Sequence, residues 1–254
     1  MSREEGLELR MKSVSVALLQ LLLVVSFVGA AVPDGFRQEF QGPVDAWMNS
    51  EMESAVLFEK MNRLDTILTQ GASSWESLYW QSRTAYVRGQ IHYEREDKES
   101  SLAELERSRE LAEDSISIFE SSDSWRIMAE SSSLIMLQRG FAYIILNFQK
   151  GQNQAKRSLE LDPGNARASH VIAQFLCAAP RIAGGNMREG IESLQTLSVR
   201  PDLIEEDRFI LLLTLSEVLQ REDRIDESIA ACRDALSIYP GNGRARALLR
   251  NLLS

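Results

Sequence analysis

The stretch LELDPGNARASHVIAQFLCAAPRIAGGN, residues 159–186, decides the fold class. Its first ten residues, LELDPGNARA, return near the C-terminus at 236–245 as LSIYPGNGRA. The prolines of the two copies, Pro163 and Pro240, are 77 residues apart (240 − 163), which corresponds to two units of about 38 residues. A helix that ends at Pro-Gly-Asn and restarts at once is typical of the join between units of a helical repeat. The stretch therefore predicts an all-α solenoid of antiparallel helix hairpins.

Apolar residues that recur at steps of three and four predict helices along most of the chain. Residues 31–44 contain Pro33, Gly35, Gly42 and Pro43, which favours an extended lead-in, so the repeat domain is expected to span 45–254. Its first helix should end near residue 70. A last helix over 243–253 is expected to cap the open end of the array, because each unit of a solenoid buries its face only against a neighbour. Between them we expect four hairpins: 75–96 with 98–119, 125–147 with 152–161, 166–178 with 187–199, and 205–220 with 225–238.

Two glycines occupy equivalent places in the two longest predicted helices. Gly89 and Gly140 each follow an arginine, and an aromatic residue comes three or four positions later. A glycine at such a place removes the Cβ atom, so we expect both residues to permit close approach of a neighbouring helix.

The last predicted hairpin carries a recognisable pattern of large and small side chains. It resembles the tetratricopeptide repeat, a 34-residue helix-turn-helix unit, through Leu215, Ser216, Leu219, Ser228, Cys232, Ala235 and Pro240. The resemblance is specific over 205–245, fair over 135–200 and weak before 121. It implies a tetratricopeptide-like α-solenoid of the exported bacterial type, with a concave surface that receives a protein or peptide segment.

The N-terminus indicates export. Residues 14–32, VSVALLQLLLVVSFVGAAV, form an apolar run without charge shortly after Lys12, with a small-residue finish. This pattern predicts a signal peptide over 1–30 with cleavage after Ala30. An uncleaved N-terminal anchor is the alternative, because the run is nearly long enough to span a bilayer. Met11 begins such a signal better than Met1 does, and no cysteine follows the run to form a lipoprotein. We expect the protein in the periplasm or attached to the envelope.

The overall charge argues against two broad classes of partner. The 254 residues carry a formal net charge of −9, whereas a surface that reads phosphates needs clustered Lys and Arg. Nucleic acid and general binding to anionic membranes are therefore not expected. The composition, with 44% hydrophobic residues, is ample for a folded domain or a repeat array.

Residues 179–186 form an enlarged turn within the third predicted hairpin. A Pro followed by Gly-Gly-Asn and a helix is similar to a feature of the periplasmic T component of TRAP transporters, whose family is thought to handle small hydrophobic ligands. The turn could also present backbone N–H groups to an anion beside Arg181. The purely structural interpretation is that Gly184 and Gly185 make the turn while Asn186 caps the next helix, and it is favoured because no phosphate-binding fingerprint surrounds them.

Aromatic residues crowd the first predicted hairpin. Trp80, Tyr86 and Tyr93 are candidates for lining a concave groove, although core packing is the commoner fate of such side chains. Together with the enlarged turn, they complete the set of candidate binding residues: Arg181, Gly184, Gly185, Asn186, Trp80, Tyr86 and Tyr93.

No pattern in the sequence supports catalysis. His92 and His170, the only histidines, lie on different predicted helices, and no His, Cys and carboxylate cluster has the spacing of a metal site. No serine sits in a Gly-x-Ser-x-Gly turn. Cys177 and Cys232 fall on apolar helix faces, which favours small core residues and leaves one disulfide open. We therefore predict no cofactor, no metal and no enzymatic activity.

Two functions of different classes remain. The first is a non-catalytic scaffold of the periplasm or envelope, which binds a protein or peptide segment in its concave groove. The second is an accessory ligand-binding subunit of a TRAP-type transport system, which binds a small apolar ligand as a homo-oligomer. An enzyme of unrecognised type ranks third.

Overall fold

The computed structural model describes residues 32–33, 35–70, 73–181 and 184–254. Within these ranges the chain forms eleven α-helices and no strand, which confirms the all-α prediction. The signal peptide predicted over 1–30 lies outside the described residues. None of the described helices is long and apolar enough to cross a bilayer. The helices are α2 (Phe36–Met48), α3 (Ser54–Gln70), α4 (Trp75–Glu94), α5 (Lys98–Ile118), α6 (Ser122–Arg139), α7 (Phe141–Leu161), α8 (Ala166–Ala178), α9 (Met187–Ser198), α10 (Glu205–Arg221), α11 (Ile225–Ile238) and α12 (Gly243–Leu253).

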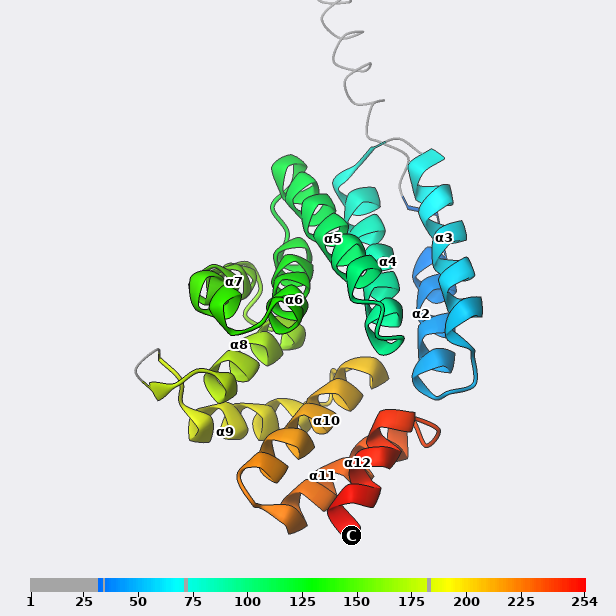
Figure 1. Ribbon diagram of the computed structural model, residues 1–254. Coiled ribbons are helices and arrows are strands. Elements are labelled where there is room, and N and C mark those ends of the chain that lie inside the picture. Colours follow the sequence, from blue (N-terminus) through cyan, green and yellow to red (C-terminus); the bar gives the residue numbers. More distant parts are fainter. Residues whose placement is uncertain (1–31, 34, 71–72, 182–183) are drawn as a thin grey trace, which may run out of the picture.

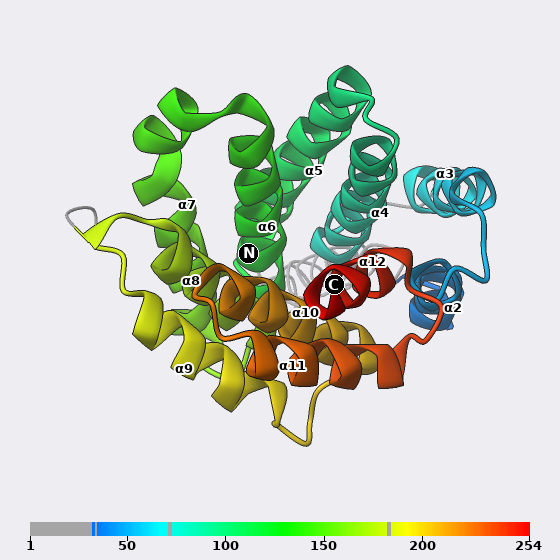
Figure 2. The ribbon, with the colours of Figure 1, turned by 60° about the horizontal axis from the view of Figure 1, so that its bottom comes forward.

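Consecutive helices pack as hairpins, and the hairpins stack into a curved array (Figures 1 and 2). Each even-numbered helix from α4 to α10 contacts the next even-numbered helix, so these helices form the inner layer and the odd-numbered helices form the outer one. The four hairpins expected between residues 75 and 238 are present, and α12 packs on α11 at the C-terminal end. The break expected between 147 and 152 in the second hairpin is wrong, because α6 ends at Arg139 and α7 begins at Phe141. The α-solenoid with a capping helix is therefore confirmed.

Polar residues fix where many of the helices begin. The side chain of each such residue accepts a hydrogen bond from the backbone N–H three positions later, which satisfies one of the donors that the first turn leaves free. Pro-Gly-Asn supplies this cap twice, since the asparagine of each copy starts the following helix. The capping residues are Ser74, Asp97, Ser121, Asn165, Asn186 and Asn242.

Serine pairs join the two helices of several hairpins. Ser216 donates to the carbonyl oxygen of Ser228 at 2.9 Å, and Ser228 donates to that of Ser216 at 2.8 Å. Ser82 bonds the carbonyl oxygen of Ser108 in the same way at 2.7 Å. All four side chains are completely buried, and their hydroxyls are satisfied, so burial carries little penalty. The small size of serine, rather than a catalytic role, explains why serine occurs at these positions.

The predicted extended lead-in over 31–44 is wrong for residues 36–44, which belong to α2. Phe36, Phe40 and Val44 recur every four residues and are buried against α3 and α4, so burial of this stripe outweighs the Pro and Gly signals. The helix expected from Asp45 to residue 70 is two helices, because residues 49–53 turn the chain between α2 and α3. The array thus gains a fifth hairpin.

The sequence predicts close packing at Gly140 and a break at Gly151, and the structure shows the reverse. Gly140 has φ +84°, and open space surrounds the position that a Cβ atom would take, so it ends α6 instead of permitting close packing. Gly151, expected in a break between 147 and 152, lies inside α7, where a Cβ atom would come within 2.8 Å of Met136 and 3.0 Å of Phe175. Gly89 does permit close approach, since its Cβ position lies 2.8 Å from Leu105.

The C-terminal copy of the repeated motif also joins the two ends of the array. The Tyr239 hydroxyl donates to Asp45 at 2.6 Å, and the Gly241 backbone N–H donates to the Asn49 side chain at 2.7 Å. A Cβ atom on Gly241 would lie 1.8 Å from the carbonyl oxygen of Asn49. The turn between α11 and α12 therefore packs directly on the end of α2 (Figure 2), and the inner layer becomes nearly a closed ring.

Both cysteines are free and buried. Cys177 belongs to the cluster between α8 and α11, whereas Cys232 belongs to the cluster under α12. The alternative of a disulfide between Cys177 and Cys232 is therefore wrong, and the prediction that both serve as small core residues is confirmed.

Candidate functional site

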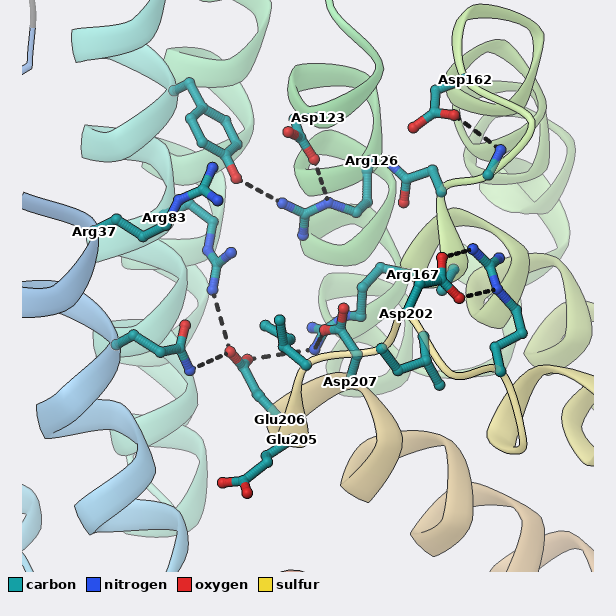
Figure 3. Close-up of a pocket in the computed structure, with 18 of the residues that line it drawn as sticks. Arg37, Arg83, Asp123, Arg126, Asp162, Arg167, Asp202, Glu205, Glu206 and Asp207 are labelled. Atoms are coloured by element: carbon teal, nitrogen blue, oxygen red, sulfur yellow. Dashed lines mark hydrogen bonds and ion pairs between the residues drawn. The ribbon is translucent and has the colours of Figure 1, made fainter.

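A pocket of about 430 Å³ lies on the inner side of the ring (Figure 3). Five inner helices contribute to it: α2, α4, α6, α8 and α10, together with the turns that precede α8 and α10. Because the array closes on itself, α2 faces α10 across this space although the two are far apart in sequence. The charged residues that line it are Arg37, Asp45, Arg83, Asp123, Arg126, Asp162, Arg167, Arg200, Asp202, Glu205, Glu206 and Asp207.

Arg167, in the first turn of α8, lies at the centre of the charges. Its Nε donates to Glu130 at 2.6 Å, and its Nη1 lies 3.3 Å from Glu206 and 3.4 Å from Asp207. Figure 3 shows Glu206 and Asp207 approaching this arginine from α10. Arg167 and Glu206 are both more than nine-tenths buried, so this ion pair holds α8 and α10 at a fixed distance.

A second buried arginine ties α6 to α4. Arg126 donates to the other oxygen of Glu130 at 2.9 Å and to the Tyr79 hydroxyl at 2.8 Å, and it also contacts Asp123 at 3.3 Å. Glu130 is thus held between two guanidinium groups, Arg126 and Arg167. Such multiply bonded charge pairs fix side-chain positions, and they orient the wall of the pocket.

The pKa values follow from this geometry. Burial alone would raise the pKa of Glu130, but the attraction of Arg167 and Arg126 outweighs burial and lowers it to about 2. The same balance lowers the pKa of Glu206, against burial, through Arg83 and Arg167. At Asp207 burial dominates and raises the pKa despite Arg167. Glu130 and Glu206 are therefore ionised at neutral pH and act as fixed negative charges.

The guanidinium of Arg83, on α4, has hydrogen-bond donors that no described residue accepts. It donates no hydrogen bond to any described residue, its buried Nε is without an acceptor there, and its closest ion pair is the 3.6 Å contact with Glu206. The guanidinium lies over the ring of Phe40 at 4.9 Å, and Figure 3 places the exposed Arg37 of α2 beside it. An unpaired buried donor carries a cost that an oxygen atom of a ligand would remove.

His170 takes no part in proton transfer at this site. Its Nε2 lies 2.9 Å from the Thr214 hydroxyl on α10. Burial first, and then the positive charge of Arg167, lower the pKa of His170 to about 3. The ring is therefore neutral at neutral pH, and it serves as a buried hydrogen-bonding residue between α8 and α10.

The three aromatic residues predicted to line a groove lie in different environments. Trp80 lines the pocket and is half-buried, with its ring 5.3 Å from that of Phe36 and 5.2 Å from that of Phe40. Tyr86 is half-buried on the same helix, and burial, followed by Glu130, raises the pKa of its hydroxyl. Tyr93 is 47% exposed at the end of α4 and lines neither this pocket nor the one beside the enlarged turn.

The enlarged turn forms a second hollow of about 730 Å³ between the start of α9 and the turn that joins α10 to α11. Arg181, Gly185 and Asn186 line it with Arg188, Glu222 and Arg224, so the structure brings these predicted residues together. Their backbone donors are engaged in the turn itself. Gly184 N–H bonds the carbonyl oxygen of Arg181, Gly185 N–H bonds that of Pro180, and Asn186 N–H bonds that of Leu176.

Each residue of this turn has a structural reason to be present. Gly184 has φ +87°, which favours glycine. A Cβ atom on Gly185 would lie 1.7 Å from the carbonyl oxygen of Ala179. The Asn186 side chain caps α9 by accepting from the backbone N–H of Glu189. These contacts support the structural interpretation over the anion site.

Sequence reasoning missed the arginines of the pocket. Arg83, Arg126 and Arg167 come from three different hairpins, and nothing local distinguishes them from the other arginines of the chain. The available signal was their position on the inner face of helices that otherwise carry apolar or small residues. Over the described part of the chain, no group of three or more His, Cys, Asp or Glu residues has the arrangement of a metal site.

Comparisons with known proteins bear on the fold. No protein-family model matches the chain, and the search of curated proteins found no significant relative. Among solved structures, it is similar to TTC0263, a thermophilic TPR protein of Thermus thermophilus, with a TM-score of 0.54 and 15% identity over 84% of this chain and 98% of that one. YrrB, described as a TPR protein with an unusual peptide-binding site, gives a TM-score of 0.38 and 10% identity over 85% and 98%. The first similarity, together with the five stacked hairpins, shows that this chain has the tetratricopeptide-like repeat fold.

Proposed function

We propose that the protein is a non-catalytic interaction scaffold that holds a peptide segment of a partner protein in the pocket inside the ring. One observation carries the proposal: side chains from five successive inner helices converge on a single space of about 430 Å³. That volume is within the range of known ligand pockets. The buried ion pairs hold its walls in place before any ligand arrives, which lowers the ordering cost of binding.

The lining favours a peptide over an apolar molecule. A peptide backbone carries both acceptors and donors. The pocket offers the buried Nε of Arg83, which has no acceptor among the described residues, and the exposed guanidinium of Arg37. It also offers carboxylates at Asp202 and Asp207. The small apolar ligand of a TRAP-type accessory subunit would require burial of these charges without compensation, which is costly. The lining therefore supports the scaffold, and the resemblance to the T component stays a prediction.

The chemistry of the site supports a binding role. Glu130 and Glu206 are held ionised by arginines, and His170 is held neutral by burial, so none of the three is poised to exchange a proton near neutral pH. Burial raises the pKa of Asp207, but this carboxylate lies 3.4 Å from Arg167 and belongs to the same ion-pair network.

Selection of peptides tests the proposal. Random peptides displayed on phage are selected on the protein, and the enriched sequences are measured by fluorescence anisotropy. Arg37→Glu reverses an exposed charge at the rim of the pocket and should weaken binding at least about tenfold. Arg63→Glu, on the outer helix α3 with the Arg63 side chain 75% exposed, is the matched control and should leave affinity unchanged. Absence of enriched peptides, or equal effects of both variants, contradicts the proposal.

We also propose that the protein works outside the cytoplasm. The support is the uncharged apolar run over 14–32 in the sequence, which fits a signal peptide or an N-terminal anchor. Cell fractionation with N-terminal sequencing of the isolated protein is the test. Processing after Ala30 in the periplasm supports export, and an intact N-terminus in the envelope supports the anchor. An unprocessed cytoplasmic protein refutes both.

A further inference from the structure

The first half of α7 leaves an apolar surface uncovered. Residues 141–150 include none of the buried residues of this helix, all of which lie at Gly151 or beyond. The sequence of this half, FAYIILNFQK, is nevertheless mostly apolar. The exposed fractions of its large side chains, together with that of Leu137 shortly before the Gly140 break, are 67% for Leu137, 71% for Phe141, 62% for Ile145 and 81% for Leu146.

These side chains form one patch. Phe141 and Ile145 are four residues apart and therefore share one face of α7. Leu146, which is 81% exposed, extends this exposed side of the helix. Leu137 lies in the last turn of α6, just before the corner at Gly140, and this corner projects from the body of the array (Figure 2). Isolated exposed apolar residues are ordinary, but a contiguous patch of several hundred Å² marks an interaction site.

Basic residues follow the apolar patch on the exposed side of α7. The segment 137–157 contains four basic residues and no acidic one, although the whole chain carries −9. Arg139 pairs with Glu106, and Arg157 pairs with Glu120 and Glu160. Lys150 and Lys156 are exposed and form no ion pair with a described residue. Glu160 is the first acidic residue of α7 and lies one turn after Lys156.

We propose that this outward face of α7 docks on the surface of an anionic lipid bilayer. The apolar end enters the region between headgroups and acyl chains, while Lys150 and Lys156 meet lipid phosphates. A helix from 141 to 156 is about 24 Å long, enough to lie flat with both parts in contact. The net negative charge of the protein opposes binding of the rest of its surface to anionic lipids, so this face is the one expected to contact the bilayer. A second copy of the chain would bring the same two lysines, and the exposed Glu160 that it brings with them is already paired with Arg157.

Flotation with lipid vesicles tests this surface. The chain from Ala31 is used, because it contains every residue of the five buried clusters and omits the apolar run that would bind vesicles by itself. Vesicles of phosphatidylcholine are compared with vesicles that also contain phosphatidylglycerol. We expect the protein to bind the anionic vesicles at least about tenfold more tightly.

Three double variants separate the contributions. Lys150→Gln with Lys156→Gln should weaken binding to anionic vesicles about 30-fold, since each lysine contributes about fivefold. Phe141→Ser with Leu146→Ser should weaken it at least about tenfold. Val199→Ser with Leu253→Ser changes exposed apolar residues elsewhere, 77% and 60% exposed, and should change nothing. Circular dichroism and urea midpoints check that all variants fold.

Two results overturn the proposal. One is equal flotation of the wild type, the lysine variant and the serine variant. The other is a wild-type dimer in sedimentation equilibrium that the Phe141→Ser, Leu146→Ser variant dissociates while neither protein binds vesicles, since a second copy would then cover the patch. Peptide affinity at the ring pocket should be the same in all these variants, because the α7 face lies outside the pocket lining.

Discussion

Replacement of Glu130 by glutamine tests the ion-pair network that shapes the pocket. Glu130 accepts from Arg167 at 2.6 Å and from Arg126 at 2.9 Å, and its side chain is 4% exposed. Glutamine keeps the size and one acceptor but removes the negative charge, so two buried arginines lose their common partner. Loss of one partner from a buried pair typically costs about 3–5 kcal/mol.

The lowered pKa of Glu130 gives a second, independent value for its contribution to the free energy of unfolding. The pKa of Glu130 falls from 4.5 to about 2 on folding, and each unit corresponds to about 1.4 kcal/mol. The charged carboxylate therefore adds roughly 3 kcal/mol to the free energy of unfolding at pH 7. Because the folded pKa lies below the unfolded one, this contribution is complete above pH 4.5 and is lost as the pH falls towards 2. At a pH of about 3.5 about 2 kcal/mol should remain.

Urea unfolding followed by circular dichroism at several pH values between about 3.5 and 7 measures this effect. We expect Glu130→Gln to lower the free energy of unfolding by about 3 kcal/mol at pH 7 and by about 2 kcal/mol at a pH of about 3.5. Asp226→Asn, at the start of α11, is the control for removal of an acidic residue outside the network. A difference between wild type and Glu130→Gln that is below about 1 kcal/mol at pH 7, or that does not shrink with acid, refutes the reasoning.

Three further predictions concern the enlarged turn, the contact between the two ends of the array and the buried cysteines. Gly185→Ala should destabilise the protein by about 2 kcal/mol or more in urea, because its Cβ atom would lie 1.7 Å from the carbonyl oxygen of Ala179; an unchanged midpoint contradicts the turn geometry. Tyr239→Phe removes the 2.6 Å bond to Asp45 and should increase hydrogen exchange in α2 while changing stability by about 1 kcal/mol; unchanged exchange in α2 argues against ring closure. Both cysteine thiols have pKa values raised by burial, so a thiol reagent should label them only after urea unfolding, and rapid labelling of the native protein contradicts their placement.

Much of the fold follows from local signals. The Pro-Gly-Asn repeats and the apolar stripes predict the boundaries of α8 to α12 within about two residues, because most of these helices have a capping residue and one clear buried face. Prediction fails where two local signals compete. In α2 the stripe of Phe36 and Phe40 prevails over Pro43, which tolerates a helical position when burial compensates. At Gly140 and Gly151 only the neighbouring helices decide which glycine ends a helix.

The pocket depends on distant residues and was largely out of reach of sequence reasoning. Trp80 could be proposed from the aromatic crowding on its helix, and it does line the pocket. Glu206 appears in the sequence as part of an acidic first turn, which suggests only a favourable contact with the helix dipole. Its role in the network depends on Arg83 and Arg167, which lie 123 (206 − 83) and 39 (206 − 167) residues away. Ring closure, which brings α2 to α10, has no local signal at all.

Hydrogen exchange of the protein with a selected peptide bound tests the central claim most directly. If the peptide occupies the pocket inside the ring, protection should increase in α2, α4, α6, α8 and α10, which line it, and stay unchanged in the outer helices α3, α5 and α11. Protection confined to the outer helices, or binding without any protection of the inner ones, would contradict a scaffold that holds its partner in this pocket.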